Sequence, residues 1–140
     1  MAQTKIGING FGRIGRNAFK LAFDRGDLEI VSVNDLTDTK TLAYLLAHDS
    51  NYGAYKYEVG HDDDGIIVNG QHIKVTAERD PVNLPWGELG VEVVIESTGR
   101  FTEKELAEQH ITAGAKRVII SGPSKSEGVD TIVLGANEDK

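Results

Sequence analysis

The sequence predicts an α/β fold with a doubly wound, mainly parallel sheet, helices on both faces and one inserted antiparallel hairpin. Short aliphatic segments alternate with segments whose apolar residues recur at helical spacing, which is typical of strands joined by helices. In the middle of the chain, Asn69-Gly70 separates two strand-like segments, and this dipeptide favours a two-residue hairpin turn. With 140 residues, the chain is predicted to form a single domain, 1–140.

Each element is predicted from its own stretch of sequence. The strands are runs rich in Ile, Val and Leu, at residues 5–9, 28–34, 91–96, 117–121 and 131–134. The helices have apolar residues on one face, at residues 16–25, 37–48 and 102–113, and the hairpin occupies residues 65–76. Asp38 is predicted to cap the second helix, and Thr102 with Glu105 has the spacing of a capping box for the third. Gly26 suits the left-handed position behind the first helix, and Gly114 is expected to end the third.

Composition argues against several classes of function. Lys and Arg total 15 and Asp and Glu total 22, and the resulting net charge of −7 argues against a nucleic-acid or anionic-membrane surface. No Cys is present, which excludes a disulfide scaffold, a thiolate metal site and a cysteine nucleophile within these residues. The 4 histidines lack metal-ligand spacing, so no metal is expected. No apolar run is long enough for a secretion signal or a membrane span, and we therefore expect a cytoplasmic protein.

The segment Gly10-Phe11-Gly12-Arg13-Ile14-Gly15 matches the pattern G-x-G-x-x-G, directly after a predicted strand and before a predicted helix. In Rossmann domains the first glycine allows a tight turn, the second lets a diphosphate approach the backbone, and the third lets the helix lie close to the sheet. The N–H groups of the first helical turn and the helix dipole then attract the phosphates. The alternative interpretation is a plain strand-to-helix turn. The side chains of Arg13 and Arg16 are either phosphate contacts or ordinary surface charges.

Asp35 ends the second predicted strand, 20 residues after Gly15, where a carboxylate accepts hydrogen bonds from the adenine ribose. A carboxylate there repels a 2′-phosphate, so NAD is expected in preference to NADP. The alternative is a solvated turn residue. The loops 97–99 and 121–123 follow two further predicted strands, and we expect them either on the ligand side of the sheet or as ordinary turns.

The chain also resembles a known family along its whole length. Residues 5–16 (KIGINGFGRIGR) closely resemble the N-terminal NAD-binding domain of glyceraldehyde-3-phosphate dehydrogenase. The same resemblance extends to residues 33–36 (VNDL), 48–50 (HDS), 78–81 (ERDP), 96–101 (ESTGRF), 117–121 (RVIIS) and 135–137 (GAN). One mild departure is Gly122, where the family usually has Ala.

The resemblance implies a role in NAD binding for a set of residues. The implied cofactor-binding residues are Gly10, Phe11, Gly12, Arg13, Ile14, Gly15, Asn34, Asp35, Arg79, Thr98, Gly99, Phe101 and Ser121. Within this set, Arg13 and Ile14 would donate backbone N–H groups to the pyrophosphate, and Asn34 and Asp35 would flank the adenosine ribose. Arg79 would contact the adenine region, largely through its backbone, and Phe101 would form a wall of the adenine pocket. Thr98 and Gly99 would border the dinucleotide, and Ser121 would lie near the nicotinamide-side ribose.

The resemblance further implies a phosphorylating dehydrogenase of a small phosphorylated aldehyde, assembled as a homotetramer. In that mechanism a Cys thiolate attacks the aldehyde, hydride passes to NAD, and inorganic phosphate takes the acyl group. The catalytic Cys belongs to a segment expected beyond residue 140, so we expect this chain to lack the catalytic domain, to bind NAD weakly and to be inactive alone. We also expect an exposed apolar patch. The alternatives are a free-standing dinucleotide-binding module without catalysis and an erythrose-4-phosphate dehydrogenase.

Overall fold

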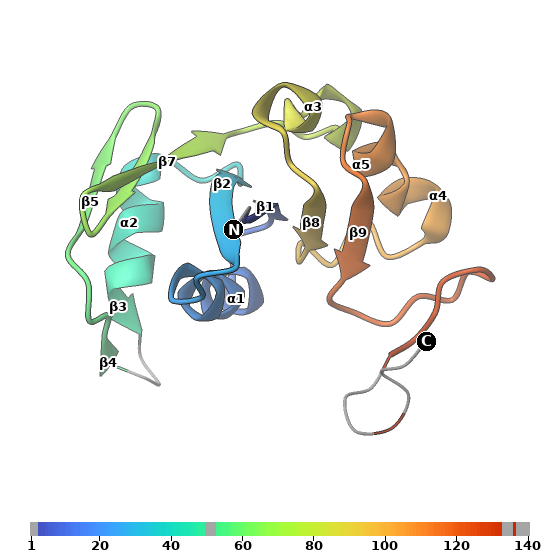
Figure 1. Cartoon of the computed structure of the whole chain (residues 1–140), viewed down its shortest axis with the longest axis horizontal. Helices are drawn as coiled ribbons and strands as arrows, with labels where there is room; N and C mark the ends of the chain where they lie inside the picture. The colour runs from blue at the N-terminus through green and yellow to red at the C-terminus, as the bar shows by residue number, and fades with distance from the viewer. Residues whose placement is uncertain (1–2, 50–52, 133–135, 137–140) are drawn as a thin grey trace.

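The computed structural model describes residues 3–49, 53–132 and 136, and its main feature is a seven-stranded sheet (Figure 1). The strand order in this sheet is β5-β6-β7-β2-β1-β8-β9, and β3 and β4 form a separate two-stranded pair. The strands are β1 (Thr4–Asn9), β2 (Leu28–Asn34), β3 (His48–Asp49), β4 (Gly53–Ala54), β5 (Val59–Asp62), β6 (Gly65–Val68), β7 (Gln71–Thr76), β8 (Val93–Glu96) and β9 (Arg117–Ile120).

The sheet is parallel around β1, which pairs with β2 on one side and with β8 on the other. The pairs β2–β7 and β8–β9 are also parallel, whereas β5–β6 and β6–β7 are antiparallel. The predicted hairpin is confirmed: φ is 51° at Asn69 and 79° at Gly70, and positive values at both central residues define the two-residue turn that Asn-Gly favours. The mainly parallel α/β class is therefore confirmed.

The helices lie between these strands in the sequence. They are α1 (Arg13–Phe23), α2 (Thr39–Ala47), the 3₁₀ turn η1 (Pro81–Asn83), α3 (Trp86–Leu89), α4 (Lys104–Ala107) and α5 (Gln109–Thr112). In Figure 1, α2 lies beside the hairpin strands, and α3, α4 and α5 gather near β8 and β9. Asp38 caps α2 as predicted, because its carboxylate accepts a hydrogen bond from the Thr41 N–H at 2.7 Å.

Two groups of buried apolar side chains form the core. The larger core cluster lies between β1, β2, the hairpin, α1 and α2, and includes Ile6, Ile8, Phe11, Phe19, Ile30, Val33, Leu42, Leu46, Ile66, Val68 and Ile73. The smaller core cluster lies near β8 and consists of Leu84, Trp86, Val91, Val94 and Ala115. Both clusters pack against the central strands, and their burial is the main driving force for the fold.

Several predicted boundaries are wrong. Helix α1 begins at Arg13 rather than at residue 16, because the glycine loop passes directly into the helix with Gly12 as its N-cap. Gly26 does not adopt a positive φ, whereas Gly114 does, at 116°. Thr131 and Ile132 lie outside any strand, and the rest of the strand predicted at 131–134 lies outside the described residues.

The predicted helix 102–113 is two short helices, and its capping box is not formed. Glu103, not Thr102, is the N-cap of α4, and no side chain of the N-cap residue bonds to the helix. The Lys104 N–H instead donates to the Ser126 hydroxyl at 3.0 Å, and this hydroxyl in turn donates to the Glu103 carboxylate. Ser126, which is distant in the sequence, thus accepts a hydrogen bond from the first turn of α4, a role that the local spacing assigns to Thr102.

Candidate functional site

A cavity of about 360 Å³ opens at the carboxyl ends of four parallel strands. Its lining includes Gly10 and Gly12 after β1, Asp35 after β2, Arg79 after β7 and Thr98 after β8. Ligands of open α/β sheets bind in the crevice at this edge. The cavity therefore brings the predicted glycine loop together with residues from three other loops.

The three glycines of the loop differ in the space around them. Gly10 has a φ of 92°, and a Cβ there would come within 2.7 Å of the Thr98 nitrogen. A Cβ on Gly15 would lie 2.1 Å from the Gly10 carbonyl oxygen, so only glycine allows α1 to approach the strand this closely. At Gly12 an added Cβ would meet nothing within 4 Å, so the backbone is open to the cavity that Gly12 lines.

The N-terminus of α1 faces this opening with unused backbone donors. The Arg16 N–H donates to the Gly12 carbonyl at 2.9 Å, which leaves the N–H groups of Arg13, Ile14 and Gly15 without a helical partner. The N-cap residue, Gly12, has no side chain that could bond to these groups. These N–H groups and the positive end of the helix dipole can bind an anionic group such as a diphosphate.

Asp35 joins the glycine loop to the loop after β2. Its Oδ2 accepts a hydrogen bond from the Phe11 N–H at 2.8 Å, and its Oδ1 accepts one from the Thr37 N–H at 2.9 Å. Each carboxylate oxygen has a second lone pair, so the group that lines the cavity can still accept hydrogen bonds from a ligand. Asp35 thus has a structural role that its position in the motif does not reveal.

Two of the predicted residues have buried side chains. Phe11 is 1% exposed, and its ring packs edge-on against Phe19 with the ring centres 5.6 Å apart, so only its backbone faces the loop. The Asn34 side chain donates to the Glu78 carbonyl and accepts from the Glu78 N–H, each at 2.9 Å. Asn34 therefore fixes the chain at the cavity wall next to Arg79.

The wall formed by Thr98 depends on a buried carboxylate, Glu96, which sequence reasoning missed. Glu96 is 1% exposed, and its Oε2 accepts hydrogen bonds from the Thr98 N–H at 2.9 Å and the Thr98 hydroxyl at 2.6 Å. Its Oε1 accepts one from the Asn9 amide at 2.6 Å and lies 2.8 Å from His110 Nε2. Burial opposes ionisation, but the hydrogen bonds from His110, Thr98 and Asn9 outweigh it and hold the pKa of Glu96 below its ordinary value.

The signal that could have identified Glu96 was a charged residue ending an otherwise aliphatic strand. The sequence analysis treated it only as the end of that strand. A buried Glu is rare unless it is paired, so a Glu at the end of a strand predicted to be buried implies partners elsewhere in the chain. His110 is one of these partners, and the sequence analysis considered it only as one of 4 histidines that lack metal-ligand spacing.

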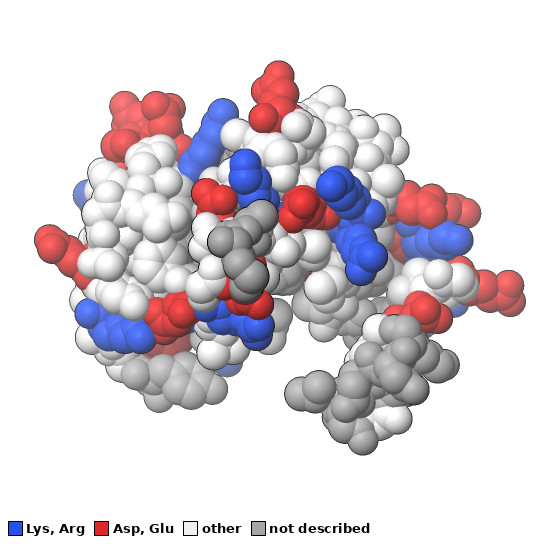
Figure 2. Space-filling model, viewed as in Figure 1, with Lys and Arg blue, Asp and Glu red and all other residues white. Residues whose placement is uncertain are grey.

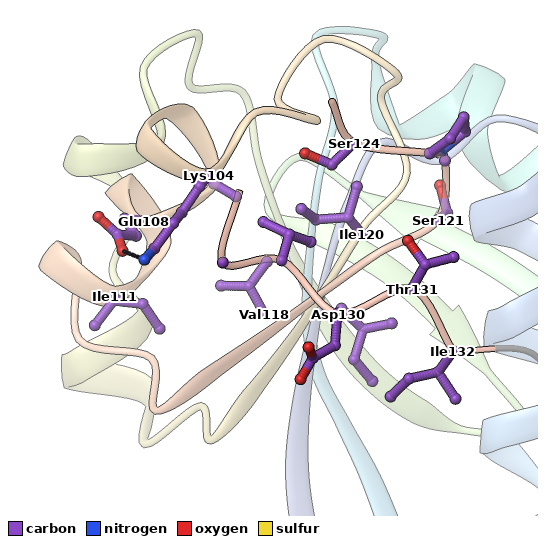
Figure 3. A pocket seen from close by; sticks show the side chains of 16 residues that line it. Lys104, Glu108, Ile111, Val118, Ile120, Ser121, Ser124, Asp130, Thr131 and Ile132 are labelled. Atoms are coloured by element: carbon purple, nitrogen blue, oxygen red, sulfur yellow. Dashed lines mark ion pairs between the residues drawn. The ribbon is translucent and has the colours of Figure 1, made fainter. Parts of the chain in front are cut away.

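Of the remaining predicted residues, some line this cavity and others do not. Phe101 lines it, and its ring lies edge-on to His110 with the ring centres 6.5 Å apart. Arg13, Ile14 and Gly99 are exposed next to lining residues but do not line the cavity themselves. Ser121 lines a second cavity of about 600 Å³ between β9 and the α4–α5 segment, shown in Figure 3. The structure thus brings most of the predicted site together but places Ser121 in a neighbouring hollow.

On the face drawn in Figure 2, basic and acidic side chains are interspersed, without one continuous basic patch. Among residues 3–49, 53–132 and 136, no cluster of His, Asp and Glu could hold a metal ion. None of the helices in the described part of the chain is long and apolar enough to cross a membrane.

Comparison with known families assigns the chain to a family. The family model described as "Glyceraldehyde 3-phosphate dehydrogenase, NAD binding domain" matches residues 4–104, which include the loop, Asp35, Arg79 and Thr98. The chain belongs to the glyceraldehyde-3-phosphate dehydrogenase NAD-binding domain family. NAD is therefore its cofactor, and the open backbone at Gly12 with the free N–H groups beside it fits this assignment.

Curated relatives of the chain bear the same family name. Glyceraldehyde-3-phosphate dehydrogenase of Geobacillus stearothermophilus is 58% identical over 137 residues, which are 98% of this chain and 41% of the relative. Glyceraldehyde-3-phosphate dehydrogenase 1 of Bacillus cereus is 55% identical, over 99% of this chain and 41% of the relative. Glyceraldehyde-3-phosphate dehydrogenase of Streptomyces coelicolor is 58% identical, over 97% of this chain and 40% of the relative. The chain thus spans about two fifths of the length of these relatives.

Proposed function

We propose that the chain is the NAD-binding portion of a phosphorylating glyceraldehyde-3-phosphate dehydrogenase. The observation that carries the proposal is the glycine loop: open at Gly12, closed to any side chain at Gly15, and bonded to the Asp35 carboxylate. NAD, when bound, supplies the group that accepts a hydride from the substrate. The residues of this chain bind and orient it.

We assign the binding roles from the position of each residue. The N–H groups of Arg13 and Ile14 hold the diphosphate, because they are the free donors at the start of α1. Asp35 accepts hydrogen bonds from the ribose hydroxyls. Phe11 and Asn34 act through the backbone that they position, since their side chains are buried. Phe101 and Arg79 line the adenine end of the cavity. Thr98 lines another wall, and Gly99 borders the dinucleotide next to it.

We further propose that the sheet is doubly wound, with the cofactor at the place where the strand order reverses. The chain passes from β1 to β2, continues to the edge strand β5, and comes back through β6 to β7 beside β2. It then crosses to β8 on the other side of β1. The carboxyl ends of β1 and β8 are Asn9 and Glu96, and the cavity opens beyond them. This reversal is the usual site of nucleotides in open α/β sheets.

The proposed substrate is a small phosphorylated aldehyde, which is oxidised and joined to inorganic phosphate by a catalytic segment that these 140 residues do not contain. The name that the relatives share supports this substrate class. Assembly as a homotetramer in the cytoplasm, with Ser121 near the nicotinamide-side ribose, forms part of the same proposal and rests on the family resemblance.

Calorimetric titration of the chain with NAD and, separately, with NADP tests the proposal. We expect NAD to bind at least about tenfold more tightly than NADP, because the Asp35 carboxylate repels a 2′-phosphate. Adding glyceraldehyde 3-phosphate and phosphate to the chain with NAD should produce no NADH, since no thiol is present. A chain that binds neither dinucleotide contradicts the proposed function.

A further inference from the structure

A line of buried polar side chains runs beneath the cofactor cavity. The Trp86 indole N–H donates to His110 Nδ1 at 3.0 Å, and His110 Nε2 lies 2.8 Å from Glu96 Oε1. Trp86 and His110 are fully buried, and neither of them nor Glu96 lines the cavity. Buried polar groups destabilise a fold unless each is paired. When all are paired, as in this line of contacts, the network makes the surrounding structure rigid.

The direction of each hydrogen bond in the line follows from the donors available. An indole N–H can only donate, so His110 Nδ1 is an acceptor and the ring proton lies on Nε2, pointing at Glu96. With Asn9 and the two donors of Thr98, Glu96 then accepts four hydrogen bonds, which is about the capacity of a carboxylate. The ring of Trp86 is itself fixed against β1, since a Cβ at Gly7 would lie 2.6 Å from it.

The line continues from Glu96 to the opposite wall of the cavity. The Asn9 side-chain amide N–H donates to Glu96, and Asn9 Oδ1 accepts a hydrogen bond from the Asn34 side-chain amide at 2.8 Å. Asn34 in turn holds both the N–H and the carbonyl of Glu78, which lines the cavity. One set of hydrogen bonds therefore connects the Thr98 wall with the Glu78 wall across β8, β1 and β2. We call this set the buried relay, consisting of Trp86, His110, Glu96, Asn9 and Asn34.

We propose that Glu96 and His110 are positioning residues for NAD: through the buried relay they hold both walls of the cavity in the arrangement that binds the cofactor. This inference rests on the proposed function, because it takes NAD as the occupant of the cavity. Preorganised walls lose little conformational entropy on binding, whereas loosened walls have to be ordered by the ligand. Weakening the relay should therefore lower NAD affinity even though the altered residue lies outside the cavity lining.

The test compares the NAD dissociation constants of four forms of the chain by calorimetric titration. His110→Phe keeps an aromatic ring but removes both links to Trp86 and Glu96, and we expect about a tenfold loss of affinity. His110→Gln retains one acceptor and one donor, and we expect it to restore affinity to within about threefold of wild type. Val91→Ala is the matched control, because Val91 belongs to the smaller core cluster, is 2% exposed and takes no part in the relay.

Val91→Ala should lower the thermal midpoint yet leave the dissociation constant unchanged, which separates loss of stability from loss of positioning. Equal affinities for His110→Phe and Val91→Ala overturn the inference, while failure of the wild-type chain to bind NAD refutes the proposed function itself. If His110→Phe does not fold, Glu96→Gln decides the matter. It keeps the shape of the side chain but replaces one acceptor oxygen with a donor, so we expect about a tenfold loss, and wild-type affinity overturns the inference.

Discussion

Two walls of the cofactor cavity, the glycine-loop wall and the Thr98 wall, are built in different ways. The glycine-loop wall, residues 10–15, is shaped by the main chain, through a positive φ at Gly10 and a close approach at Gly15. The Thr98 wall is held by a buried side chain, Glu96, whose partners His110 and Asn9 lie 14 and 87 residues away in the sequence. One wall thus depends on local residue types, and the other on contacts that only the folded chain creates.

This difference determines what a substitution does. A side chain added to the glycine-loop wall would contact the backbone or the ligand directly. A substitution in the Thr98 wall acts through several hydrogen bonds, and its effect depends on whether the remaining groups find new partners. Substitutions in the two walls should therefore differ in their effects on stability and on NAD affinity.

The largest effect is expected for Gly15→Ala. The new Cβ would lie 2.1 Å from the Gly10 carbonyl oxygen, so α1 has to move away from the strand. We expect a loss of about 3 kcal/mol in the free energy of unfolding, measured by urea denaturation. Gly26→Ala is the control, since a Cβ there meets nothing within 4 Å and Gly26 has no positive φ. Equal stability of the two variants would show that α1 does not need its close approach.

Gly12→Ala should affect binding instead of folding. Its Cβ meets no protein atom within 4 Å, so the urea midpoint should stay at the wild-type value. The methyl group projects where we place the diphosphate, and we expect about a tenfold loss of NAD affinity, or about 1.4 kcal/mol. Calorimetric titration measures this loss. Unchanged affinity would mean that the diphosphate does not approach Gly12.

A smaller effect is expected for Asp35→Asn. An amide keeps one acceptor oxygen, so one of the hydrogen bonds from Phe11 and Thr37 is lost, at about 1 kcal/mol of stability. The lost charge should also reduce the preference for NAD over NADP, measured by paired titrations. Asp63→Asn, in the exposed turn between β5 and β6, removes the same charge elsewhere and should change neither quantity. A preference that survives Asp35→Asn would assign cofactor selection to another residue.

The last prediction concerns how the stability of the fold depends on pH. The pKa of Glu96 is held below its ordinary value of 4.5 in the fold, so the native state binds this proton less readily than the unfolded chain does. The stabilisation from Glu96 is therefore fully present above pH 4.5 and is lost as the pH falls through the lower folded value. Urea unfolding of wild type and Glu96→Gln between pH 3 and 7 should give curves that converge in acid. Parallel curves would contradict a paired Glu96.

The same contrast explains how much could be predicted from the sequence. The glycine loop, the Asp38 cap and the Asn69-Gly70 turn were predictable, because each depends on conformational preferences of neighbouring residues. The Thr102 capping box failed because Ser126, distant in sequence, supplies the hydrogen bond to Lys104. Two partners of Glu96 were missed for the same reason. Sequence spacing does not show that Asn9 in β1 and His110 in α5 lie beside Glu96 in β8.

The placement of aromatic residues gives the two halves of the molecule separate optical signals. The chain has 1 tryptophan, Trp86, and it lies in the smaller core cluster. Tyr55 and Tyr57 contact each other with ring centres 5.4 Å apart and pack against the larger core cluster. Indole emission therefore follows melting on the β8 side, and tyrosine absorbance follows melting on the hairpin side. Coinciding denaturation curves from the two chromophores would identify the domain as one cooperative unit, and separated curves would resolve two.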